Sequence, residues 1–210
     1  MRRARRAGAA TPQVVLAVKA DSDAGLLDTI LARYAGQESA LPVVVRLCGW
    51  DEQPRLLRQG EADVALVHSP FDSTGLDAEP VVVEPTVAAV PATHPLAPAG
   101  RATLADLGLP VTDSSDLAGV RRYQAHLVER HGVRDLAQLL ALVELGRIVT
   151  LVPRSVADRY PRPGLTYLDV PDAPPAVLTI AWPQDSRSTA VAALVRAATD
   201  PEPVLRGPLT

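Results

Sequence analysis

The side chains best suited to binding a ligand lie in short polar clusters, each directly after a run of Val, Leu and Ala. Apolar runs of this length are typical of buried strands in a parallel sheet. Because ligands of such sheets bind at the carboxyl ends of the strands, we expect these clusters to meet at one edge. The clusters are Asp21-Ser22-Asp23, Gly49-Trp50-Asp51 and His68-Ser69.

Catalytic signatures are absent from the sequence. It contains no Gly-X-Ser-X-Gly nucleophile motif, no glycine loop followed by a phosphate-binding lysine, no dinucleotide-binding glycine pattern and no His-Glu-X-X-His. The histidines are scattered, and His126 and His131 are spaced too far apart to share a helical face. A single cysteine, Cys48, forms neither an internal disulfide nor a zinc cluster. We therefore predict no catalytic residue, no metal site, no cofactor and no enzyme activity.

Composition narrows the class of protein. Of the 210 residues, 47% are apolar and 21% charged, which indicates a globular chain, and the aromatic content of 3% requires a core of Leu, Val and Ala. The net charge of −3 argues against nucleic-acid binding by the body of the protein. No apolar run approaches the roughly 18 residues of a membrane span. The Arg-rich start is followed by too short an apolar run for an export signal, so we expect no membrane contact and a cytoplasmic location.

Hydrophobic periodicity predicts alternating strands and helices. Strands are expected at 14–18, 42–47, 63–67, 81–84, 87–90, from Val111, and at 148–152, 165–170 and 177–182. Helices are expected at 23–34, 52–59, 116–131, 136–145, 153–160 and 188–198. The alternation is typical of an α/β fold with right-handed crossovers. Residues 81–90 hold two strands without an intervening helix, so we expect the chain to leave one lobe there and enter another.

Four segments resemble the effector-binding domain of LysR-type transcriptional regulators. They are residues 57–67 (LRQGEADVALV), 89–97 (AVPATHPLA), 104–107 (LADL) and 139–153, which runs from LLALVELG to LVP. Their order and spacing over residues 13–200 carry the resemblance.

The resemblance implies a type 2 periplasmic-binding-protein-like fold, in which two α/β lobes are joined by two crossing strands near 88–91 and 165–170. Lobe one would take residues 13–88 and 168–200, and lobe two residues 89–167. Residues 1–12 would form a basic arm, and 201–210 a loose tail. The family's DNA-binding helix-turn-helix is not in this chain, which would make it either a truncated regulator or a stand-alone module.

The resemblance also implies a ligand site between the lobes. Family members usually carry Ser or Thr at the first ligand position, which corresponds by chemistry to Ser22 and by strict register to Lys19 or Asp21. The carboxylates at this helix start would repel an anionic ligand unless Lys19 or Arg134 offsets their charge. A cationic or neutral ligand is therefore expected. The candidate ligand residues are Lys19, Asp21, Ser22, Trp50, His68, Ser69, Pro91, Thr93, Thr112, Arg134 and Asp135.

Each candidate also has a purely structural interpretation. Asp21 and Asp23 could be helix caps, Trp50 a half-buried core residue and His68 a surface histidine.

The function implied is a regulatory module that binds a small-molecule effector and changes lobe or dimer geometry. A homodimer or higher oligomer is expected, with the helix around Leu26 to Tyr34 contributing, and DNA contact only through the absent helix-turn-helix. A solute-binding protein of the same fold and an enzyme on this fold are the alternatives.

Overall fold

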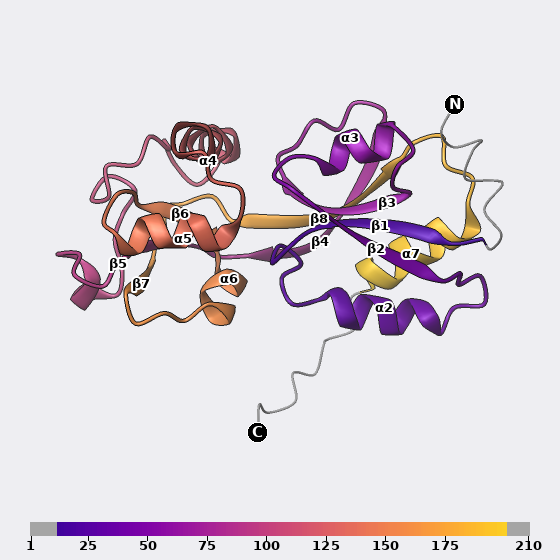
Figure 1. The fold of residues 1–210 in the computed structure, drawn as a ribbon, viewed down its shortest axis with the longest axis horizontal. Helices are drawn as coiled ribbons and strands as arrows, with labels where there is room; N and C mark the ends of the chain where they lie inside the picture. Colours follow the sequence, from indigo (N-terminus) through magenta and orange to yellow (C-terminus); the bar gives the residue numbers. More distant parts are fainter. Residues whose placement is uncertain (1–11, 201–210) are drawn as a thin grey trace, which may run out of the picture.

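The computed structural model describes residues 12–200, which form two α/β lobes connected by two long strands (Figure 1). The predicted fold class is confirmed. The expected basic arm and tail fall mainly outside the described residues. Within residues 12–200, no helix has the length and apolar character needed to cross a membrane.

Lobe one is built on a five-stranded sheet in the order β2-β1-β3-β8-β4. Strand β1 pairs in parallel with β2 and β3, whereas β8 runs antiparallel to both β3 and β4. The carboxyl ends of β1, β2 and β3 therefore meet at one edge. The strands are β1 (Val14–Lys19), β2 (Val43–Cys48), β3 (Val64–Ser69), β4 (Leu76–Glu84) and β8 (Ala176–Pro183).

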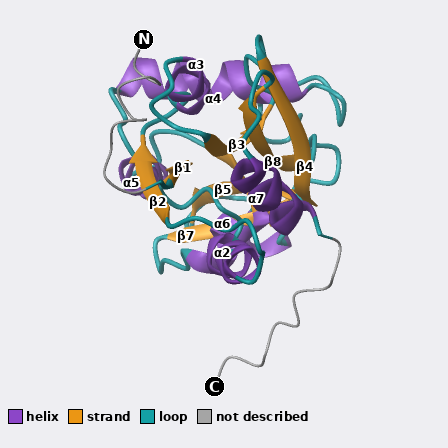
Figure 2. Cartoon of the chain, turned by 90° about the vertical axis from the view of Figure 1, so that its right-hand side faces the viewer, coloured by secondary structure: helices purple, strands orange, loops and turns teal. Residues whose placement is uncertain are grey.

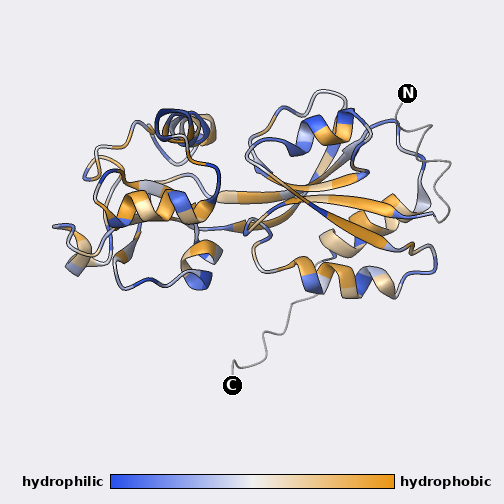
Figure 3. Cartoon of the chain, in the orientation of Figure 1, coloured by the Kyte–Doolittle hydropathy of each residue, from blue (hydrophilic) through white to orange (hydrophobic). Residues whose placement is uncertain are grey.

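Helices cover both faces of this sheet. Helices α2 (Leu27–Ala35) and α7 (Thr189–Thr199) pack together on one face, and α3 (Gln53–Arg58) covers the other (Figure 2). Alternate residues of β1 explain this division, because Leu16 joins the core under α2 and α7 whereas Ala17 joins the core under α3. The central strands are apolar along their length, as expected for strands buried on both faces (Figure 3).

Lobe two is smaller and has a three-stranded antiparallel sheet in the order β6-β5-β7. Its elements are β5 (Thr86–Pro91), a short 3-10 helix η1 (Ala97–Ala99), α4 (Leu117–His131), α5 (Leu136–Glu144), β6 (Thr150–Pro153), α6 (Arg154–Arg159) and β7 (Leu165–Asp169). Two apolar clusters, one on each face of the sheet, form its core.

Both lobe boundaries differ from the predicted positions by a few residues. The chain passes into lobe two at Pro85, because β5 from Thr86 onward belongs wholly to the lobe-two sheet. It returns between β7 and β8, so β7 is a lobe-two strand and not a crossing strand. The Thr86 hydroxyl donates a buried 2.6 Å hydrogen bond to the Pro174 carbonyl and thereby ties the two connections together.

One predicted strand, from Val111, is wrong. Residues 110–116 form a loop in which the Asp113 carboxylate accepts bonds from the Ser115 amide and hydroxyl. The Asp116 carboxylate accepts from Thr112 and also caps α4 through the Gly119 amide. These local side-chain bonds turn the backbone, while Val111 itself is buried in the lobe-two core.

Candidate functional site

A cleft of about 140 Å³ lies between the lobes and is walled by both. Lobe one contributes the loops after β1, β2 and β3, together with the first turn of α3. Lobe two contributes an apolar wall from α4, α5, β6 and α6. That wall consists of Leu117, Val120, Leu136, Leu139, Leu151, Val152, Pro153 and Val156.

The lobe-one rim has an unusual backbone. Asp21 and Asp51, in the loops after β1 and β2, have φ angles of 62° and 56°, and Ala24 has 52°. Aspartate tolerates this left-handed region better than most residues, and such conformations cost about 1–2 kcal/mol each. The turns place both carboxylates on the cleft lining.

Lys19 brings a partly buried positive charge to the lobe-one wall. Its ammonium lies 3.9 Å from the centroid of the Trp50 ring and donates hydrogen bonds to Ser22 Oγ at 3.1 Å and the Ala20 carbonyl at 3.4 Å. Burial lowers the pKa of Lys19, and the nearby acidic groups, Asp21 first among them, oppose this only in part. No carboxylate in residues 12–200 forms an ion pair with it.

Three buried polar atoms on the lobe-one wall have no hydrogen-bond partner in the described part of the chain. They are Trp50 Nε1, Gln53 Oε1 and His68 Nε2. The Gln53 amide nitrogen donates to the Leu66 carbonyl at 3.4 Å, so only its oxygen is unpaired. Burial lowers the pKa of His68 to about 4, with the Lys19 charge contributing, and the imidazole is therefore neutral at pH 7.

Charged contacts cross the cleft at both rims. Arg121 of α4 pairs with Asp51 at 3.5 Å and donates to the Pro70 carbonyl at 3.1 Å. At the other rim, Arg159 of α6 donates a 2.8 Å hydrogen bond to Asp23. Trp50 also crosses, since its ring packs against the lobe-two core. The lobes are thus held closed over the cleft.

Asp23 is nearly buried, at 9% exposure, and serves two elements. Its second oxygen accepts a hydrogen bond at 3.3 Å from the amide of Leu27, the first residue of α2. Burial alone would raise the pKa of Asp23, but the hydrogen bond and charge of Arg159, together with the Leu27 amide, outweigh it and hold the pKa below its ordinary value.

Six predicted site residues line this cleft: Lys19, Asp21, Ser22, Trp50, His68 and Ser69. The Ser69 hydroxyl exchanges a 3.0 Å hydrogen bond with Thr179 of β8, so it is engaged within lobe one. As ligand contacts these six remain predictions. The structure adds Gln53, Arg121 and Gln124, which the sequence patterns did not mark, and Asp51, which the sequence placed in a polar cluster but not among the candidate ligand residues.

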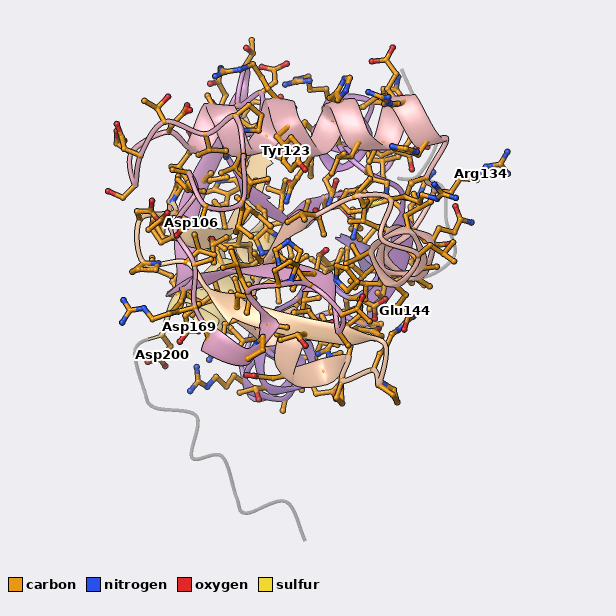
Figure 4. All side chains as sticks on the ribbon, turned by 90° about the vertical axis from the view of Figure 1, so that its left-hand side faces the viewer. Asp106, Tyr123, Arg134, Glu144, Asp169 and Asp200 are labelled. Carbon is orange, nitrogen blue, oxygen red and sulfur yellow. The ribbon has the colours of Figure 1, made fainter. Side chains whose placement is uncertain are left out.

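Five predicted residues do not line the cleft: Pro91, Thr93, Thr112, Arg134 and Asp135. Strand β5 starts at the cleft with Thr86 and runs away from it, which places Pro91 about 16 Å farther along. Thr112 is bonded to Asp116 in the loop before α4. Asp135 caps α5 through the Gln138 amide, and Arg134 projects outward from lobe two (Figure 4).

The cleft does not assemble the groups of a metal site. Within residues 12–200 no cluster of three or more His, Cys, Asp or Glu side chains could hold a metal ion. Cys48, at the end of β2, is half-buried, and burial followed by the Glu52 charge raises the pKa of its thiol to about 11. Its thiolate is therefore scarce at pH 7.

Comparison with solved structures shows the fold. The BenM effector-binding domain with its effector benzoate superposes with a TM-score of 0.64 at 21% identity, covering 89% of this chain and 90% of that one. A full-length OxyR variant from Pseudomonas aeruginosa superposes with a TM-score of 0.63 at 17% identity, covering 94% of this chain and 73% of that one.

Sequence comparison shows the family. A probable hydrogen peroxide-inducible genes activator of Mycobacterium avium is 32% identical over 142 residues. The match covers 62% of this chain and 45% of that relative, so the chain spans less than half of its length. Residues 7–200 match the LysR substrate binding domain. The chain therefore belongs to the family of LysR substrate-binding domains, as its sequence motifs predicted.

Proposed function

We propose that this chain is the effector-binding module of a LysR-type transcriptional regulator and that a small molecule binds between its lobes. The observation that carries the proposal is a cleft closed by cross-lobe ion pairs, with Trp50 Nε1, Gln53 Oε1 and His68 Nε2 left unpaired in its wall.

The unpaired atoms explain how a ligand would act. A buried donor or acceptor without a partner costs about 1–3 kcal/mol, and the cost is relieved when the lobes open and water enters. A ligand that pairs with these atoms removes the cost in the closed form only. It therefore shifts the population toward closure by its difference in affinity for the two forms.

The signal would reach DNA through other parts of the regulator. One structural neighbour is full-length CbnR complexed with its target DNA, which this chain covers to 72%. By analogy we propose that the regulator containing this module is cytoplasmic and assembles as a homodimer or higher oligomer. Its DNA contact would be made by a helix-turn-helix domain, and this module would carry out no catalysis.

The edge strand β2 is a candidate for self-association. Its Val44, Val45 and Leu47 side chains are exposed. Its Val43 packs against the core cluster that includes Ile30 and Tyr34 of α2, the helix that the sequence marked as a dimer element. An exposed apolar strand edge is a ready surface for pairing with another copy.

A thiol-based response to peroxide, suggested by the name of the mycobacterial relative, is not supported by this chain. Its single cysteine has no second cysteine in the chain to form a disulfide, and its raised pKa keeps the thiol protonated. We therefore propose a response to ligand binding and not to cysteine oxidation.

The test is a metabolite library screened by thermal shift, with hits measured by small-angle scattering. We expect a hit to raise the melting temperature and to reduce the radius of gyration. Trp50→Leu should abolish both effects, whereas Trp182→Phe, in lobe one and outside the cleft lining, should retain them. A hit that binds Trp50→Leu as well as the wild type would place the ligand elsewhere and refute the cleft proposal.

A further inference from the structure

We propose that the cleft selects a small monoanion with an apolar body and that Lys19 is the residue that selects its charge. This inference rests on the proposed function, since it concerns the ligand of the same cleft.

The charge of Lys19 is partly buried and has no ion-pair partner within residues 12–200. Its two hydrogen-bond acceptors, Ser22 Oγ and the Ala20 carbonyl, are uncharged oxygens, and the Trp50 ring covers another side of the ammonium. Lys19 is the only lysine of the chain. Desolvation makes a partly buried cation without a counter-ion costly, so an anion beside it gains more than the same anion would gain from a fully exposed lysine.

Two carboxylates at the rims of the cleft are paired with arginines of lobe two. Asp51 pairs with Arg121, and Asp23 pairs with Arg159. The carboxylates whose charges reach Lys19 are Asp21 and Asp135, and within residues 12–200 neither forms an ion pair with its ammonium. We therefore infer that an anionic ligand can supply the counter-ion that these carboxylates do not, in place of the cationic or neutral ligand that the acidic residues suggested.

Further hydrogen-bond donors lie on the same wall of the cleft. The Ser22 oxygen accepts from Lys19, so the hydroxyl proton is directed elsewhere and no acceptor for it exists in residues 12–200. The Trp50 indole N–H is buried and also without an acceptor in that range. One ammonium, one hydroxyl and one indole N–H form a set of donors that suits a carboxylate or a similar planar anion.

The lobe-two wall of the cleft indicates that the uncharged part of the ligand is small and apolar. Val120, Leu139 and Leu151 present an apolar surface from lobe two. The cleft volume of about 140 Å³ is close to that of an apolar cavity of about 150 Å³ that binds benzene. The charged head would therefore contact lobe one and the apolar body lobe two, so that one small molecule bridges both lobes.

The experiment compares molecules that differ in charge but not in shape. Benzoate, benzamide and benzamidinium form one set, and isobutyrate, isobutyramide and isobutyramidinium a second. Dissociation constants are measured from Trp50 fluorescence in the Trp182→Phe protein, with calorimetry as a second readout. We expect a carboxylate to bind at least about tenfold more tightly than its amide and amidinium partners, which corresponds to about 1.4 kcal/mol.

Lys19→Met should reduce this preference to less than about twofold, and Lys19→Arg should retain part of it, because the charge is kept. Arg147→Met removes the same charge from an exposed site beyond the end of α5 that lies away from the cleft, and it should leave the preference unchanged. Lys19→Gln serves as a second neutral variant if the methionine variant is unstable.

The outcomes separate the two proposals. Equal or tighter binding of an amide or amidinium, or a carboxylate preference that survives in Lys19→Met, would overturn the anion inference and leave the effector-binding function standing. Failure of all six probes to bind would also overturn the inference, whereas the effector-binding function is decided by the metabolite screen.

Discussion

Replacing Arg159 by methionine should open the cleft without unfolding either lobe. Arg159 donates a 2.8 Å hydrogen bond across the cleft to Asp23, which is 9% exposed. In the closed form of the variant, the Asp23 carboxylate would remain buried with only the Leu27 amide as a partner. In the open form it would be hydrated. The substitution therefore penalises closure specifically.

The size of the effect follows from the burial of the two partners. A hydrogen bond to a charged group contributes about 1.5–3 kcal/mol when buried, and an exposed ion pair about 0–1 kcal/mol. Because the Arg159 side chain is 39% exposed, we expect an intermediate value of about 1–2 kcal/mol, which changes the ratio of open to closed molecules about 5–30-fold.

The pH dependence of closure gives this prediction a second readout. The pKa of Asp23 is held below its ordinary value of 3.8, so the contribution of the pair is fully present above that value. It is lost as the pH falls through the lowered pKa of the closed form. Wild-type protein should therefore open at acidic pH, and this dependence should be weaker in Arg159→Met.

The assay combines the radius of gyration from small-angle scattering with the emission of Trp50 in a Trp182→Phe background. Opening removes Trp50 from the lobe-two core and should shift its emission to the red. Arg154→Met is the matched control, because Arg154 lies on the same helix but pairs with Asp169 inside lobe two. Equal changes in the two variants would show that the Arg159 bond does not hold the lobes together, which would refute the reasoning.

Three further predictions concern other parts of the chain. Cys48→Ser should keep ligand affinity within about twofold, and peroxide should leave the wild-type melting temperature unchanged, because the raised pKa of the Cys48 thiol disfavours the thiolate. Loss of the ligand response after peroxide treatment would contradict this prediction. Leu47 of β2 is 67% exposed, and Leu47→Glu should weaken self-association at least about tenfold in sedimentation experiments. Val83→Glu on the opposite edge of the sheet should leave self-association unchanged. A wild-type protein that is monomeric would disprove this prediction. His68 should not change the ligand affinity between about pH 6 and pH 8, because its pKa is lowered to about 4. A step in affinity near pH 6.5 that His68→Gln removes would contradict this prediction.

The sequence allowed the lobe-one side of the cleft to be predicted because its residues follow strands in a regular pattern. Lys19, Trp50 and His68 each come at or directly after the end of a parallel strand, and parallel strands end at a common edge. Asp23 is not the N-cap residue of α2, which is Leu26, but its carboxylate does accept a hydrogen bond from the Leu27 amide.

The other half of the site could not be predicted, because it depends on how the lobes face each other. Arg121 and Arg159 occupy helices whose sequences give no sign that they meet carboxylates of the other lobe. Gln53 falls at the start of a short amphipathic helix, where nothing distinguishes a cleft residue from a core residue. Pro91 was misplaced because only the pairing of β5 reveals which end of that strand lies at the cleft.

The hydrogen bond between Thr86 and Pro174 restricts how the two lobes can move relative to each other. Two independent connections would let the lobes bend, twist and slide separately. The buried hydrogen bond joins the two connections at one point, so we expect the lobes to rotate about this point and to slide little against each other. The angle between the lobes should then describe the states from open to closed, and any ligand that acts on the cleft would be read out as a change in that angle.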